Sequence, residues 1–178
     1  LGIREDVTVL NVSLLASPDY REKIFKKLNI PSSSKGLSEG TCSNEVILNY
    51  ILRNKPSELP LYIGFPTWKQ LVNDNNNFYL VGLALEYSTK NIDNIALLQN
   101  NFENKFVLDY IKNNLFFDIS NDLVNKSNLN YLPGIFKLYE HYILSGELAR
   151  ALKMKELGLL IAQKGGQGWL DKASSILK

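Results

Sequence analysis

Apolar positions recur at steps of three and four residues along the C-terminal part of the chain, from Tyr131 to Lys178. This spacing places apolar side chains on one face of a helix. It predicts three consecutive helices, separated at Ser145-Gly146 and at Gly165-Gly166, where glycine lets the chain leave the helix. The apolar face of the first helix is formed by Ile135, Leu138, Tyr139 and Tyr142. Connections this short make neighbouring helices antiparallel.

Small residues lie among the large apolar side chains of the second and third of these helices. Ala151 and Gly158 occupy such positions in the second helix, and we expect a neighbouring helix to approach closely there. In the third helix, Trp169, Ala173 and Leu177 form the next apolar stripe.

Similar spacing predicts shorter helices upstream. Ser17 and Pro18 are typical of a helix start, and Thr67 with Gln70 forms a capping box. Val7 to Leu15 fits a strand as well as the opening of a helix, and the pattern leaves both open. The upstream helices are expected after Ser17 and Thr67 and over residues 45–54, 78–88, 92–102, 104–117 and 120–124.

These patterns predict an all-α fold of antiparallel helical hairpins, in a single domain over residues 1–178. Pro31 to Asn44 is rich in Ser and Gly, which defeats both helical and strand periodicity. We therefore interpret residues 1–44 as an N-terminal arm and loop, and residues 45–178 as the helical core.

The spacing of large and small residues around the first C-terminal hairpin resembles that of the tetratricopeptide and Sel1-like helical repeats. The matching positions are Ile135, Leu138, Tyr142, Gly146, Ala151 and Gly158. Trp169 lies 34 residues after Ile135, which is the tetratricopeptide period. Tyr139 departs from the pattern because the family has a small residue at its position. In the next repeat Ala173 supplies the small residue, whereas Lys172 departs because it stands where the family has a large apolar residue.

A second match lies upstream, so that the resemblance covers about residues 78–178. Its positions are Leu80, Leu83, Ala84, Tyr87 and Ala96, with Asn91 in place of the glycine. Leu80 and Ile135 are 55 residues apart, which is not a multiple of 34, so the array is not a regular tandem. An irregular helical domain whose small residues mark helix contacts is the alternative interpretation.

Composition and charge exclude several classes of protein. The formal net charge of +2 gives no basic footprint for nucleic acid. The single cysteine, Cys42, excludes an internal disulfide framework, and with His141 as the single histidine it disfavours a zinc site. No apolar run approaches roughly 18 residues, so no transmembrane helix is predicted. No phosphate-binding loop is present either, and we expect no cofactor and no metal.

The function predicted from these observations is a non-catalytic protein-binding module, such as an adaptor, chaperone or assembly factor, whose partner is another protein or a peptide. The repeat resemblance implies that the first helix of each hairpin lines a groove. The partner-binding residues it implies are Val81, Leu85, Phe136, Glu140 and Ile143. The alternative is a secreted effector or immunity-type protein that binds one partner by surface shape, and a third interpretation is a helical enzyme with a pocket around His141.

The chain begins with Leu1 rather than methionine. Both a processed exported protein and a fragment of a longer protein explain this start, so the compartment stays open.

Overall fold

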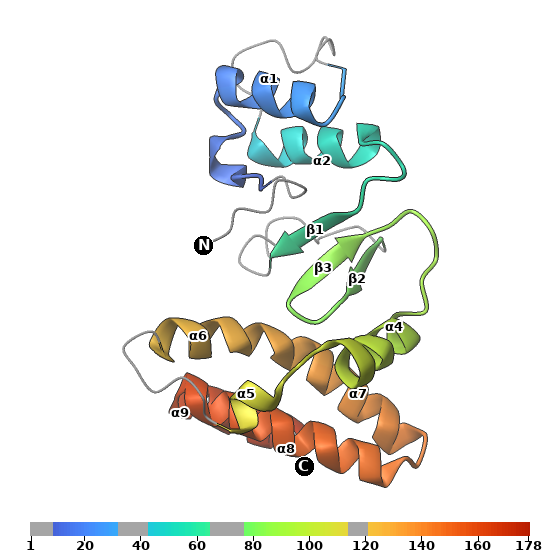
Figure 1. The fold of residues 1–178 in the computed structure, drawn as a ribbon, viewed down its shortest axis with the longest axis vertical. Coiled ribbons are helices and arrows are strands. Elements are labelled where there is room, and N and C mark those ends of the chain that lie inside the picture. The colour runs from blue at the N-terminus through green and yellow to red at the C-terminus, as the bar shows by residue number, and fades with distance from the viewer. Residues whose placement is uncertain (1–8, 32–42, 65–76, 114–120) are drawn as a thin grey trace. The chain divides into compact units, whose positions relative to one another are not determined.

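The computed structural model describes residues 9–31, 43–64, 77–113 and 121–178. The described chain divides into two compact units, the first ending at Pro60 and the second beginning at Leu61 (Figure 1). It is mostly helical, with one small sheet. Cys42 and the predicted capping box at Thr67 and Gln70 lie outside the described residues.

The first unit holds a 3-10 turn, η1 (Val12–Leu14), and two helices, α1 (Pro18–Lys27) and α2 (Asn44–Asn54). Ser17 is the N-cap of α1 and Pro18 begins it, as predicted. The described part of the segment from Val7 to Leu15 therefore contains a 3-10 turn and no strand.

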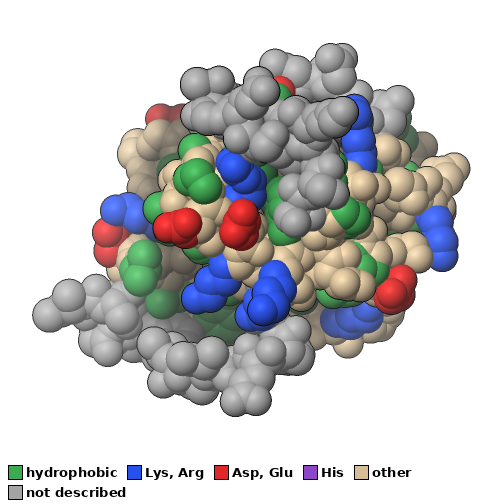
Figure 2. All heavy atoms as spheres, turned by 90° about the horizontal axis from the view of Figure 1, so that it is seen from above, with side chains coloured by type: hydrophobic (Ala, Val, Ile, Leu, Met, Phe, Trp, Pro, Cys, Tyr) green, Lys and Arg blue, Asp and Glu red, His purple; other side chains and the backbone are tan. Residues whose placement is uncertain are grey.

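Apolar side chains of α1 and α2 form the core of the first unit. The rings of Phe25 and Tyr50 are 5.5 Å apart, and the Tyr50 hydroxyl donates a hydrogen bond of 2.9 Å to the carbonyl of Pro31. The core residues are Leu15, Ile24, Phe25, Leu28, Ile30, Ile47, Leu48, Ile51 and Leu52. On the face of the molecule in Figure 2, basic and acidic side chains lie side by side among neutral ones. The described residues of this face therefore carry no large patch of a single charge sign.

The second unit begins with a three-stranded antiparallel sheet of β1 (Leu61–Gly64), β2 (Phe78–Leu80) and β3 (Ala84–Tyr87), in the order β1-β3-β2. The predictions of an all-α chain and of a helix over residues 78–88 are therefore wrong here. The reason is Gly82, whose φ of +119° turns the chain between β2 and β3. Glycine adopts such positive φ values without the steric cost that other residues incur.

The helix predicted over residues 92–102 is confirmed as α4 (Asn94–Asn100), which continues into a π-helical turn, η2 (Asn101–Lys105). The Asn94 side chain accepts from the Leu80 N–H at 3.4 Å and donates to the Leu80 carbonyl at 2.7 Å. The Asn101 side chain donates to the Val81 carbonyl at 3.0 Å. Two asparagines thus fasten the end of β2 to α4 and η2.

The helix predicted over residues 104–117 is wrong in its first part. The chain leaves η2 at Phe106, whose backbone is extended, and resumes as the short helix α5 (Asp109–Lys112). Phe106 instead packs edge-on against Phe102 and Tyr131. After the undescribed residues come α6 (Asn121–Asn128), where a short helix was predicted, and a 3-10 turn, η3 (Leu129–Tyr131).

The three C-terminal helices are confirmed as α7 (Leu132–Leu144), α8 (Leu148–Gly165) and α9 (Gln167–Ile176). Gly146 has a φ of +77° in the turn between α7 and α8. Ala151 and Gly158 are buried as predicted. A Cβ on Gly158 would lie 2.7 Å from Leu177 Cδ1 and 3.1 Å from Ile135 Cγ2, so α7 and α9 both approach α8 there.

Candidate functional site

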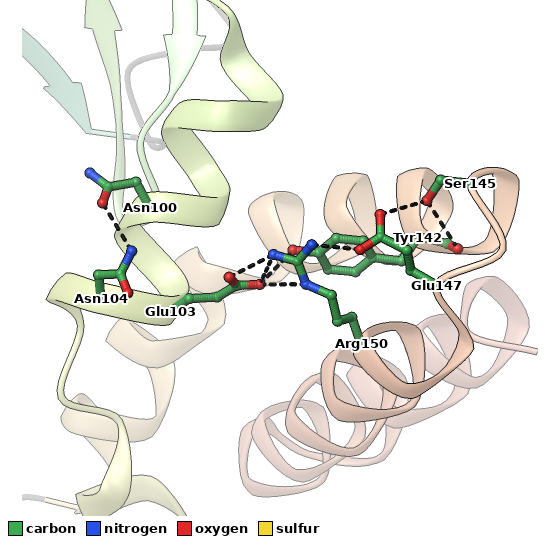
Figure 3. Close-up of polar contacts among 7 residues, drawn as sticks. All are labelled: Asn100, Glu103, Asn104, Tyr142, Ser145, Glu147 and Arg150. Atoms are coloured by element: carbon green, nitrogen blue, oxygen red, sulfur yellow. Dashed lines mark hydrogen bonds and ion pairs between the residues drawn. The ribbon is translucent and has the colours of Figure 1, made fainter.

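A network of charged and polar side chains joins η2, α7 and α8 (Figure 3). The Arg150 guanidinium donates to both carboxylate oxygens of Glu103, at 2.5 and 2.6 Å, and to Glu147 at 2.6 Å. The Tyr142 hydroxyl donates to Glu103 at 2.7 Å, and Ser145 donates to Glu147 at 2.9 Å. The guanidinium also lies 4.5 Å from the centre of the Tyr142 ring. The network therefore braces the α7–α8 turn against η2.

The network shifts the titration of its members. Burial raises the pKa of Tyr142 to about 12, and the hydrogen bond and charge of Glu103 add to this. Burial also acts to raise the pKa of Glu103, but hydrogen bonds from Arg150 and Tyr142 and the charge of Arg150 outweigh it, so this pKa is lowered. Hydrogen bonds from Arg150 and Ser145 lower the pKa of Glu147, and those from Glu147 and Glu103 raise the pKa of Arg150.

The lowered pKa of Glu103 predicts a loss of stability in acid. A carboxylate with a folded pKa below its unfolded value contributes stability that is present above the unfolded pKa and is lost as the pH falls through the folded pKa. The unfolded value is 4.5, so the free energy of unfolding should fall below about pH 4.5. Urea denaturation over a pH series checks this, with Glu103→Gln flattening part of the slope. Equal slopes for wild type and Glu103→Gln would contradict it.

Next to the network, a hollow of about 800 Å³ separates the segment of residues 102–112 from α8. The segment runs through η2, the extended residues and α5, and we call it the wall. The apolar lining of the hollow is formed by Phe102, Phe106, Val107, Leu108, Met154, Leu157 and Leu160. Its charged lining, apart from the Glu103–Arg150 pair, consists of Asp109, Lys112, Lys153 and Glu156. The hollow therefore combines an apolar floor with charged groups of both signs.

The wall is tied to α8 at both of its ends. Glu103 is bonded to Arg150, and the carbonyl of Ile111 accepts from the Lys164 ammonium at 2.7 Å. Arg150 and Lys164 are 14 residues apart on α8, or about 21 Å at 1.5 Å per residue. The hollow lies along the part of α8 from Arg150 to Leu160, at the Glu103 end of the wall.

A second feature is a group of exposed aliphatic residues around the α7–α8 turn, which we call the hairpin tip. It consists of four aliphatic residues within ten positions of the chain: Ile143 (44% exposed), Leu144 (81%), Leu148 (67%) and Leu152 (54%). The last residue of the chain, Lys178, accepts a hydrogen bond from the Tyr139 hydroxyl, one turn before Ile143. Leu177 lies against Gly158, six residues after Leu152 on α8. α9, which ends at Ile176, thus packs against the part of α8 that follows the tip.

The structure places the five predicted partner-binding residues on different elements. Leu85 is buried in β3, and Val81 is half-buried in the turn after β2, so neither lies on a helix. On α7, Phe136 is half-buried against the core, whereas Glu140 and Ile143 are exposed. Ile143 is the one member of the predicted set that belongs to the hairpin tip.

Sequence reasoning missed Arg150, Glu103 and the leucines of the tip. Glu103 and Arg150 are 47 residues apart, so no local spacing relates them. Leu148 and Leu152 fit the apolar period of their helix, and periodicity alone cannot show which part of an apolar face a neighbouring helix covers. His141 is half-buried, with its ring 5.6 Å from that of Tyr142.

No protein-family model, curated protein or solved structure matches the chain. No helix within the described ranges has the length and apolar character to cross a membrane. Among the same residues, no three His, Cys, Asp or Glu side chains are grouped so that they could hold a metal ion.

Proposed function

We propose that the protein is a non-catalytic protein-binding module that docks a helix of its partner on the hairpin tip. The observation that supports this is the exposure of four aliphatic side chains within ten positions of the chain, Ile143, Leu144, Leu148 and Leu152. Exposed apolar side chains that gather at one place commonly mark interaction surfaces. The charge network behind the turn holds the tip in place before any partner arrives.

The packing of α9 indicates which kinds of side chain a partner helix would present. This helix packs along the α7–α8 hairpin with Ala173 and Leu177 fully buried, which shows what the surface accepts. The tip continues the same hairpin beyond the end of α9. A partner helix with small and aliphatic residues at steps of three and four could extend the packing of α9 over the tip.

The resemblance to tetratricopeptide and Sel1-like repeats supports the same proposal for residues 132–178. In such repeats a helical hairpin presents a surface to a segment of another protein. The upstream half of the resemblance contributes nothing, because Leu80, Ala84 and Tyr87 lie in strands.

The proposal predicts site-specific crosslinking to one partner. A photoreactive amino acid at Leu144 should crosslink to the partner in extracts of the source cells, and the same group at Leu123 should not. Leu123 is the matched control, because it is 73% exposed on α6, outside the tip. Mass spectrometry then locates the crosslinked segment, which is synthesised as a peptide for binding measurements.

That peptide should be helical when bound. Its affinity should fall at least about tenfold for the double variant Leu148→Ser, Leu152→Ser, since losing even one leucine contact exceeds about 1.4 kcal/mol. Leu123→Ser should leave the affinity unchanged. Both variants should keep their stability within about 0.5 kcal/mol, because these side chains are exposed. A peptide that binds the double variant as tightly as the wild type would refute docking at the tip.

A further inference from the structure

The hollow beside α8 is separate from the hairpin tip. Arg150, Lys153 and Leu157 line it, and they recur at steps of three and four residues on one face of α8. Leu152 is two residues from Arg150, which turns it about 200° around a helix of 3.6 residues per turn. The hollow and the tip therefore use different residues of α8, although Glu156 of the hollow lies one turn after Leu152 of the tip.

We propose that the hollow binds an extended peptide segment, which pairs with the backbone of Val107 and places apolar side chains on the lining. This site goes beyond the docking of a helix at the tip, and neither depends on the other. The argument rests on the length of the hollow, the backbone of the wall, and the charges around it.

The length favours a peptide over a compact small molecule. The α8 residues that line the hollow run from Arg150 to Leu160, which is about 15 Å along the helix. At about 3.4 Å per residue, this distance corresponds to about four residues of extended chain. The apolar side chains of Phe106, Met154 and Leu157 line this stretch and offer positions for alternate side chains of such a chain.

The wall offers a backbone edge between its two helical turns. Phe106 is extended, with φ −81° and ψ 125°, and the next residue, Val107, is 77% exposed. Among the described residues, the N–H and the carbonyl of Val107 have no hydrogen-bond partner. An extended peptide can pair with such an edge as an added strand does, so that main-chain bonds provide affinity and side chains provide specificity.

The charges around the hollow are balanced. Lys112 and Lys153 carry positive charge, Asp109 and Glu156 carry negative charge, and none of the four has an ion-pair partner within the described part of the chain. A polyanion would meet two carboxylates here. A peptide with an apolar centre and both basic and acidic side chains could place the centre on the apolar lining, its acidic groups near the lysines and its basic groups near the carboxylates.

The test uses random linear heptapeptides displayed on phage and selected on the immobilised full chain. We expect selected peptides to share an apolar centre, and to lose at least tenfold in affinity on Lys153→Trp, which fills the hollow from its rim. Gln163→Trp is the matched control, an exposed position on α8 that does not line the hollow. The affinity of Gln163→Trp for the selected peptides should equal that of the wild type.

Val107→Pro tests the backbone pairing, because proline lacks the N–H and the extended Phe106 tolerates a following proline. The affinity should fall about three- to tenfold further than with Val107→Ala, which keeps the N–H. If Val107→Pro does not fold, the Val107 amide resonance of the wild-type protein supplies the readout, and it should shift on peptide addition. Selection of no peptides, equal affinity for Lys153→Trp, resonance shifts confined to the tip, or a helical bound peptide would each overturn the proposal.

Discussion

Replacing Tyr142 by alanine is expected to lower the free energy of unfolding of the second unit by about 3–5 kcal/mol, the range for deleting a large buried ring. Tyr142 of α7 is fully buried, and its hydroxyl donates a hydrogen bond to Glu103. The Arg150 guanidinium also packs against its ring. One substitution therefore opens a cavity and removes two contacts of the network. Urea denaturation followed by far-ultraviolet circular dichroism measures the loss.

Tyr142→Phe is the matched control, because it keeps the ring and removes only the hydroxyl. Its expected loss is about 1 kcal/mol, since the hydrogen bond goes to a carboxylate that is partly exposed to solvent. Nearly equal losses for the two variants would show that the hydroxyl, rather than the ring, stabilises the unit. A loss below about 1 kcal/mol for Tyr142→Ala would contradict the structure.

Gly82→Ala is expected to cost about 2–4 kcal/mol, from two sources. The φ of +119° is unfavourable for any residue with a Cβ, and that Cβ would lie 2.5 Å from Phe106 Cε2. The Phe106 ring packs against Phe102 and Tyr131, so it has little room to move. Thermal unfolding of the purified variant measures the cost.

Gly146→Ala separates the two sources. Gly146 also has a positive φ, of +77°, but a Cβ there would meet no atom within 4 Å. Its expected cost is therefore about 1–2 kcal/mol, from backbone strain alone. A Gly82→Ala variant no less stable than Gly146→Ala would mean that Phe106 yields without cost.

Local periodicity was enough to predict the C-terminal helices. Ile135, Leu138 and Tyr142 are all fully buried, and the turn falls at Gly146 as expected. Each of these helices repeats apolar residues at steps of three and four over two turns or more. The two-residue period of a strand does not fit such a segment. The small residues at Ala151 and Gly158 also predicted where helices approach closely.

The same reasoning failed over residues 78–88, because a short apolar run satisfies two periods at once. Leu80, Leu83 and Tyr87 fit helical steps, whereas Leu85 and Tyr87 are the two buried residues of a strand. The choice between them depends on Gly82 and on side-chain bonds from Asn94 and Asn101, which come from later in the chain. Single-sequence periodicity contains none of this information.

The candidate sites were less predictable than the fold. The network depends on Glu103 meeting Arg150, and the hollow depends on the wall leaving helical geometry at Phe106. Both are consequences of tertiary packing. Ile143 is exposed on α7, and its partner-binding role stays a prediction.

The side chain of Asn94 has a consequence for the solubility of the folded chain. β2 is an edge strand, and Leu80 is the residue whose N–H and carbonyl point away from β3 and toward Asn94. Exposed strand edges template aggregation, because the unpaired groups of one molecule can pair with those of another. The Asn94 amide instead pairs with the N–H and carbonyl of Leu80, which a strand of another molecule would otherwise use. The Lys137 ammonium donates to the same amide oxygen at 3.0 Å. At Leu80, a single asparagine thus blocks the backbone groups that another strand would need.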